Sequence, residues 1–134
     1  MIPMAPIRRI VIHHSASPRE TTFEQIEGWH LAKGWDAIGY HYLIDGDAKV
    51  HVGRPIVFQG AHAKGANRDS IGICVTGDNT RDGLWWDRVQ KLELTLLVGA
   101  LRRAFPGIQV MGHREVPGAA TLCPGVDVSW LRDA

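Results

Sequence analysis

The sequence predicts an α/β domain in which helices flank a central mixed β-sheet. Three observations lead to this prediction. Short apolar runs with strand character alternate along the chain with two longer segments of helical character. A chain of 134 residues is long enough to bury one core and too short for two, so residues 1–134 are expected to form a single domain. Hydrophobic residues make up 45% and charged residues 22%, which is typical of a globular chain and not of a disordered one.

The first half of the chain predicts a strand, a helix and a hairpin. Residues 7–14 form an apolar run that indicates a buried strand. Residues 21–33 predict a helix, because each of its two threonines stands three residues before a Glu or a Gln, which is the capping-box pattern. Gly34 fits the position that follows a helix. Residues 38–44 and 49–52 predict two strands joined by an Asp-Gly-Asp turn.

The second half predicts the longest helix between two further strands. Residues 70–76 and 108–111 have strand character, and residues 86–105 have helical periodicity that ends at a Pro-Gly pair. Residues 127–131 predict a short terminal helix. The long helix carries an apolar stripe that is expected to face the core, made of Val89, Leu92, Leu96, Leu97 and Ala100.

Charge and composition limit the possible partners. Fifteen basic and fourteen acidic residues give a net charge of +1, so we expect no nucleic-acid partner. No apolar run approaches the roughly 20 residues that span a bilayer, so we expect no membrane insertion. The first nine residues lack the apolar segment of a signal peptide, and we therefore expect the protein to be held in the cytoplasm until another factor releases it. Cys74 and Cys123 are expected to stay unpaired in that reducing compartment. We also expect a monomer.

The histidines indicate a possible metal site. The chain has seven, and His13, His41 and His113 lie at or near the ends of predicted strands. His113 is followed ten positions later by Cys123. A catalytic zinc site takes three protein ligands and leaves one position open, which a His, His, Cys set would supply. His13 is the natural third ligand, while its neighbour His14 should point to the opposite face of the strand.

The spacing alone leaves simpler interpretations open. A histidine of this kind is often a surface residue or a hydrogen-bonded core residue, and Cys123 would also serve as a small buried apolar group. His30 and His51 are interpreted as surface residues, and His41 as a residue that fills the sheet or orients its neighbours. A zinc site that only holds the fold would need a fourth protein ligand, for which His14 and His41 are the candidates.

Five segments stand in a characteristic order between Ile10 and Asp127. They are Ile12-His-His-Ser-Ala-Ser, Gly34-Trp, Gly39-Tyr-His-Tyr-Leu-Ile, Gly60-Ala-His-Ala-Lys-Gly-Ala-Asn-Arg-Asp-Ser-Ile-Gly-Ile, and Gly112-His-Arg-Glu-Val with Cys123-Pro-Gly. Together they resemble the type 2 N-acetylmuramoyl-L-alanine amidases, a family that includes phage endolysins and peptidoglycan recognition proteins.

The resemblance implies a fold, a reaction and a cofactor. The expected fold is that of the type 2 amidases and recognition proteins. The expected reaction is zinc-dependent hydrolysis of the amide between the lactyl group of N-acetylmuramic acid and L-alanine, with peptidoglycan as substrate and a phage or prophage endolysin, released from the cytoplasm to the cell wall, as the biological setting. The resemblance implies Zn²⁺ bound by His13, His113 and Cys123. The alternative is a non-catalytic peptidoglycan-binding module, which Cys123 disfavours because non-enzymatic recognition proteins lack that cysteine.

The resemblance also implies roles for five further residues. Tyr40 matches the tyrosine that faces the water at the metal, and we expect it to orient that water or pass a proton to the departing amine. Thr121 falls where recognition-protein amidases carry a threonine and some phage members carry a lysine, and we expect it to stabilise the oxyanion. His62, Asn67 and Ser70 lie in the segment that forms part of the substrate groove.

Overall fold

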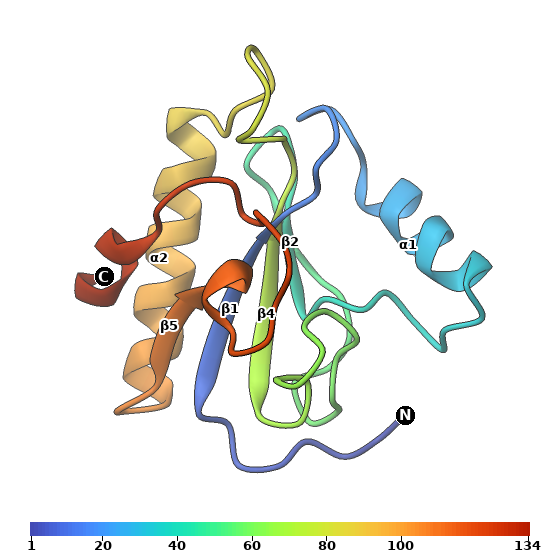
Figure 1. The fold of residues 1–134 in the computed structure, drawn as a ribbon, viewed down its shortest axis with the longest axis vertical. Helices are drawn as coiled ribbons and strands as arrows, with labels where there is room; N and C mark the ends of the chain where they lie inside the picture. The colour runs from blue at the N-terminus through green and yellow to red at the C-terminus, as the bar shows by residue number, and fades with distance from the viewer.

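The computed structural model describes all 134 residues, and a five-stranded sheet runs through its centre (Figure 1). The strand order is β3-β2-β4-β1-β5. β1 is parallel to both of its neighbours and β2 is parallel to β4, whereas β3 pairs with β2 in the antiparallel direction. The sheet is therefore mixed, as predicted. The strands are β1 (Arg9–His14), β2 (Tyr42–Ile44), β3 (Val50–Val52), β4 (Ser70–Val75) and β5 (Gln109–Gly112).

Two α-helices cover opposite faces of this sheet (Figure 1). α2 (Arg88–Ala104) packs on the face that carries most of the buried core, including Ile12 and Ile73. α1 (Phe23–Ala32) packs on the other face, near Leu43 and Cys74. Two short 3₁₀ helices follow β5, η1 (His113–Glu115) and η2 (Ser129–Asp133), and the second overlaps the short terminal helix predicted at residues 127–131. Neither α-helix has the length and apolar character that a membrane crossing requires.

Both α-helices begin with a capping box, which explains where they start. At α1, Thr22 Oγ1 accepts a hydrogen bond from Gln25 N at 3.1 Å, and Gln25 Oε1 accepts one from Thr22 N at 2.8 Å. At α2, Asp87 and Gln90 exchange the same pair of bonds. These bonds satisfy backbone donors that have no partner inside the helix. Gly34, with a φ of +88°, ends α1 as predicted.

The apolar stripe predicted for the long helix faces solvent. Val89, Leu92 and Leu96 are 56%, 55% and 57% exposed, and Ala100 is exposed as well. Leu97 is partly buried against the core. The buried face consists of Gln90, Leu94, Val98, Gly99 and Leu101.

The rotation of the long helix is determined by its first turn. Trp86 is buried, and its indole N–H donates to Val75 O at 3.1 Å. One turn later Gln90 is fully buried, because its amide donates to Thr76 O at 2.8 Å and Asp45 O at 3.0 Å. These bonds turn the polar Gln90 inward and the stripe outward. The prediction was wrong because the helix is apolar on two sides and hydrophobicity alone did not distinguish them.

The strand predicted at residues 38–44 is shorter in the structure. Only Tyr42–Ile44 forms β2. Upstream, the Arg54 guanidinium donates to Ala37 O and Ile38 O at 3.1 Å each. These carbonyl groups are paired with a side chain instead of a neighbouring strand, so the start of the predicted strand is irregular.

Candidate metal centre

The three expected metal ligands meet at the carboxyl edge of the sheet. His13 lies near the end of β1, and His113 directly follows the parallel strand β5. Because β1 and β5 are neighbours that run in the same direction, both histidines emerge at one edge, and their ring centroids lie 4.7 Å apart. Cys123 comes from the loop between η1 and η2, where its carbonyl accepts a hydrogen bond from Arg114 N at 2.7 Å.

The donor atoms of these side chains fit a zinc ion. One donor atom from each residue lies within 4.8 Å of the others. His13 Nδ1 and Cys123 Sγ are 3.7 Å apart. A tetrahedral ion with Zn–N and Zn–S bonds of about 2.05 and 2.3 Å holds two such atoms about 3.6 Å apart. Imidazole nitrogen and thiolate sulfur are also ligands that zinc accepts. Both the geometry and the chemistry of the group therefore suit zinc.

Burial controls the protonation of the three candidate ligands. Desolvation lowers the pKa of His13 well below its ordinary value, and the nearby His62 and His113 lower it further. Burial also lowers the pKa of His113. Both rings are therefore neutral at neutral pH and have a lone pair to offer. Burial raises the pKa of Cys123 to about 12, so the thiol keeps its proton in the metal-free protein, and it would have to release this proton to bind a metal.

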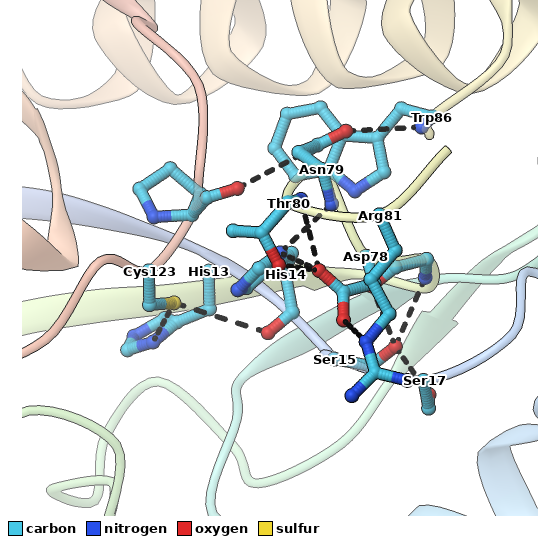
Figure 2. Close-up of polar contacts among 12 residues, drawn as sticks. His13, His14, Ser15, Ser17, Asp78, Asn79, Thr80, Arg81, Trp86 and Cys123 are labelled. Carbon is cyan, nitrogen blue, oxygen red and sulfur yellow. Dashed lines mark hydrogen bonds and ion pairs between the residues drawn. The ribbon is translucent and has the colours of Figure 1, made fainter. Parts of the chain in front are cut away.

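No fourth protein ligand completes the group. The His14 ring turns away from His13, and its Nδ1 accepts a hydrogen bond from Asn79 N at 3.1 Å (Figure 2). Both ring nitrogens of His41 are occupied, by Gly72 N at 2.9 Å and by a backbone carbonyl at 2.8 Å. Three protein ligands with an open position are typical of catalytic zinc sites, whereas structural sites have four.

Two other histidines were expected at the surface, and both have partners. His30 is buried, because its ring packs at 4.6 Å from that of Trp35 and its Nδ1 accepts a hydrogen bond from Gly39 N at 2.9 Å. His51 is half-buried and bonds Asp45 Oδ2 through Nε2 at 2.7 Å. The surface interpretation was therefore wrong for His30. His51 instead stabilises the hairpin turn.

Tyr40 lies beside the ligand His13, with a ring-centroid distance of 5.1 Å. Its ring also packs against the small core cluster that contains Cys74. Burial raises the pKa of Tyr40 well above its ordinary value, and Cys74 and Cys123 raise it further. The phenol therefore keeps its proton at neutral pH, where it can donate a hydrogen bond but cannot act as a base.

Thr121 belongs to the loop that carries Cys123. Its Oγ1 accepts a hydrogen bond from Cys123 N at 3.1 Å. A hydroxyl group that accepts one bond still has its own hydrogen to donate. Thr121 thus helps to hold the ligand loop and keeps a donor available.

The three residues expected to border a substrate groove lie behind His13, around the loop that precedes β4. His62 Nδ1 is 2.9 Å from His13 Nε2. Asn67 Oδ1 accepts a hydrogen bond from His62 N at 3.0 Å, which shapes the loop. Ser70 is 0% exposed, and its hydroxyl donates to Ala66 O at 2.6 Å. All three contact the loop or a metal ligand, and their contact with a substrate stays a prediction.

Asn79 is a site-supporting residue that sequence reasoning missed. It follows β4 and joins three parts of the chain (Figure 2). Its side-chain N–H donates to Pro124 O at 2.9 Å, directly after the ligand Cys123. Its side-chain oxygen accepts from Trp86 N at 3.1 Å, just before α2, and its backbone N–H donates to His14. The only local signal is a Gly-Asp-Asn-Thr run after a buried strand, which predicts a turn and not a partner.

A groove opens next to the site along α1. It includes Tyr40 and the exposed Trp29, whose side chain is 51% exposed and was also missed. Lys33 also lines it, and the Lys33 ammonium lies 4.9 Å from the ring centre of Trp35. The groove is lined by Ser15, Ile26, Trp29, His30, Lys33 and Tyr40. An exposed aromatic ring and a cation therefore line a groove that meets the candidate metal centre at Tyr40, whose ring lies 5.1 Å from that of His13.

Comparison with known proteins adds independent information. The family model described as N-acetylmuramoyl-L-alanine amidase matches residues 3–126. The endolysin of Enterobacteria phage T3 is 32% identical over 131 residues, which cover 94% of this chain and 85% of the endolysin. A peptidoglycan-recognition protein of Drosophila melanogaster is 33% identical over 132 residues, with 92% of this chain and 71% of that protein covered. The solved structure of the Ph2119 endolysin from Thermus scotoductus MAT2119 bacteriophage Ph2119 aligns with a TM-score of 0.85 and 32% identity, covering 97% of this chain and 84% of that one.

Proposed function

Because this chain belongs to the N-acetylmuramoyl-L-alanine amidase family, we propose that it is a zinc-dependent hydrolase of peptidoglycan. The bond that it cuts is the amide between the lactyl group of N-acetylmuramic acid and L-alanine. One observation carries the proposal: His13, His113 and Cys123 converge within 4.8 Å, and no fourth protein ligand joins them. This arrangement leaves room for a substrate or a water at the metal.

Zinc, when bound, supplies a Lewis acid that polarises the amide carbonyl and makes water nucleophilic at neutral pH. His13 and His113 hold it as neutral imidazoles, since burial lowers both pKa values. Cys123 holds it as a thiolate, which places one negative charge next to the ion.

The other two residues act as hydrogen-bond donors. Tyr40 keeps its phenol proton at neutral pH, so it orients the attacking water or passes a proton toward the departing alanine amine. The Thr121 hydroxyl, which accepts a bond from Cys123 N, donates its own hydrogen to the carbonyl oxygen as that oxygen gains charge.

We propose that the groove along α1 binds the muramyl peptide. It reaches the site at Tyr40, next to the ligand His13. The exposed ring of Trp29 offers an apolar face to the sugar or its lactyl group, and Lys33 attracts a carboxylate of the stem peptide. The endolysin relatives support a role in the lysis of a phage-infected cell. The recognition-protein relatives favour binding of the same polymer.

The test is digestion of purified peptidoglycan by zinc-loaded protein, followed by mass spectrometry of the released fragments. We expect stem peptides that begin with a free L-alanine amine. Cys123→Ser should lower their release by at least about 10²-fold, because it removes the thiolate ligand. Leu122→Ser is the matched control, since Leu122 precedes Cys123 in the same loop, is 70% exposed and is outside the ligand group.

Each alternative outcome has its own meaning. New reducing sugar ends would identify a glycosidase and overturn the amidase proposal. A digest without fragments, from protein that still sediments with the wall, would favour the non-catalytic recognition module. Equal release by Cys123→Ser and wild type would contradict the proposed ligand role of Cys123.

A further inference from the structure

The His62 ring stands directly behind the metal ligand His13. Its Nδ1 lies 2.9 Å from His13 Nε2, and the two rings meet edge to face at 87°. The other nitrogen of His13, Nδ1, faces Cys123 Sγ at 3.7 Å. One nitrogen of His13 therefore faces the metal site, while the other is bound to His62.

The direction of this hydrogen bond follows from the carbonyl at its far end. Ala66 O can only accept, so the Ser70 hydroxyl uses its single hydrogen on that carbonyl, at 2.6 Å. Ser70 Oγ is then an acceptor for His62 Nε2, at 3.3 Å. A neutral imidazole has one N–H, which in His62 is on Nε2, so its Nδ1 accepts a hydrogen bond from His13 Nε2.

The same chain of bonds determines where His13 carries its proton. With its hydrogen on Nε2, His13 has a free lone pair on Nδ1, the atom that faces Cys123. The opposite tautomer would place a hydrogen on Nδ1 and leave two acceptor nitrogens facing each other.

The surroundings of His62 are shaped to hold this ring. A Cβ atom on Gly72, in the middle of β4, would lie 2.5 Å from His62 Cγ, and one on Gly60 would lie 2.6 Å from His62 Cδ2. Only glycine leaves space for the ring at both positions. Asn67 Oδ1 holds the backbone on the third side, through His62 N at 3.0 Å.

We propose that His62 is a positioning residue that, together with Ser70, keeps His13 in the Nε2-protonated tautomer and so presents His13 Nδ1 to the metal. This role rests on the metal site of the proposed function, and it places His62 and Ser70 behind a ligand instead of against the substrate. A ligand histidine whose second nitrogen is bound in this way has a defined orientation before the metal arrives.

The test begins with metal-free protein and needs no activity. Proton–nitrogen correlation NMR spectra of the imidazole groups identify the protonated nitrogen of each ring. We expect Nε2–H for both His13 and His62 in the wild type. In His62→Leu, His13 should become a mixture of tautomers. His51→Leu is the matched control, because it removes a histidine whose partner is Asp45 and should leave the His13 signals unchanged.

Metal affinity gives a second measurement, made by competition between the protein and a chelator for Zn²⁺. His62→Leu should weaken zinc binding by about 10- to 100-fold. His62→Asn should restore most of the loss, because the Asn Oδ1 takes the place of the acceptor Nδ1. Ser70→Ala, which removes only the hydroxyl group, tests the same chain if His62→Leu folds poorly, and it should give a smaller loss.

The outcomes separate this proposal from the proposed function. Nδ1–H on His13 in the wild type, or tautomers and zinc affinity unchanged in both His62→Leu and Ser70→Ala, would overturn the positioning role even if the protein is an active amidase. The expected tautomers and affinities in a protein that releases no stem peptides would support the positioning role and reject the amidase.

Discussion

His13 and Cys123 face each other across the candidate metal centre, but different kinds of structure hold them. His13 is part of β1, which is paired on both sides and runs through the buried core. Cys123 lies in an irregular loop between two 3₁₀ helices. A few hydrogen bonds fasten this loop, to Arg114 N, to Thr121 Oγ1 and, through Pro124 O, to Asn79.

The difference has consequences for stability and for metal binding. Displacing His13 requires opening the sheet, which is a global event, whereas Cys123 moves when a few bonds break locally. We therefore expect changes in the core to lower the stability of the whole protein. Changes in the loop should mainly affect the affinity for the metal.

The largest effect is expected in the core beside His13. Ile12 is 0% exposed and belongs to the main cluster under α2. Ile12→Ala should lower the free energy of unfolding of the metal-free protein by about 2–5 kcal/mol, from lost burial and a residual cavity. Urea denaturation measures this change. Ile2→Ala, at a position 64% exposed, is the matched control and should change stability by no more than about 0.5 kcal/mol.

A smaller and more local effect is expected at Asn79. Asn79→Ala removes the donor to Pro124 O and the acceptor for Trp86 N, which should cost about 1–3 kcal/mol and weaken zinc binding by about tenfold. Asn79→Asp keeps the acceptor for Trp86 N but places a carboxylate oxygen against Pro124 O, so its effect should fall on the contact with the loop of Cys123.

Hydrogen exchange shows where the Asn79 variants open. Amides of residues 121–126 should exchange faster in both variants, while those of β1 should stay protected. Equal acceleration in β1 and in the loop would mean that the two sides of the metal centre unfold together. The comparison between His13 and Cys123 would then fail.

Low pH should lower the stability of the protein through His13 and His62. The folded pKa of His13 lies well below its ordinary value and that of His62 is about 3, while both rings ionise near 6.5 in the unfolded chain. The unfolded state therefore binds more protons below pH 6.5, and stability that is complete above this pH declines as the pH falls. Urea midpoints of the metal-free protein should be lower at pH 4.5 than at pH 7. A flat profile would show that these rings ionise freely.

High pH should lower the stability of the protein through Cys123, and this is the smallest of the predicted effects. The Cys123 thiol has an ordinary pKa of 9.0 and a folded pKa of about 12 because of burial. The folded state keeps this proton between the two values, so stability is complete below pH 9 and declines as the pH rises toward 12. Tyr40 and Cys74 also have raised pKa values, so the difference between wild type and Cys123→Ser isolates this group. The difference should diminish from pH 8 to pH 10.5, and a constant difference would contradict the raised pKa.

The chain order of the elements and the meeting of His13 with His113 could be predicted because their signals are local. A capping box and a following Gly at α1, a helical period that ends at Pro-Gly for α2, and short apolar runs marked the helices and strands within a few residues. His13 and His113 stood at strand ends, and parallel neighbouring strands bring such ends together. Cys123 could be named as a candidate ligand only from its spacing to His113 and from the family resemblance.

The remaining features depend on contacts between residues far apart in the chain. Hydrogen bonds from Trp86 and Gln90 to backbone carbonyls at the end of β4 determine which face of α2 is buried. The hydrophobic pattern of the helix did not reveal this face. Asn79 looked like an ordinary turn residue until the fold placed Pro124 against it.

The sequence by itself determined the α/β class, the approximate elements and the residue types that suit zinc, because propensity, capping and ligand chemistry are properties of short segments. Only the tertiary structure decided which nitrogen of His13 faces the metal site. That choice depends on His62, 49 positions away, and on a carbonyl that can only accept a hydrogen bond. The direction of a hydrogen-bond chain is a property of groups brought together by folding, and no local pattern encodes it.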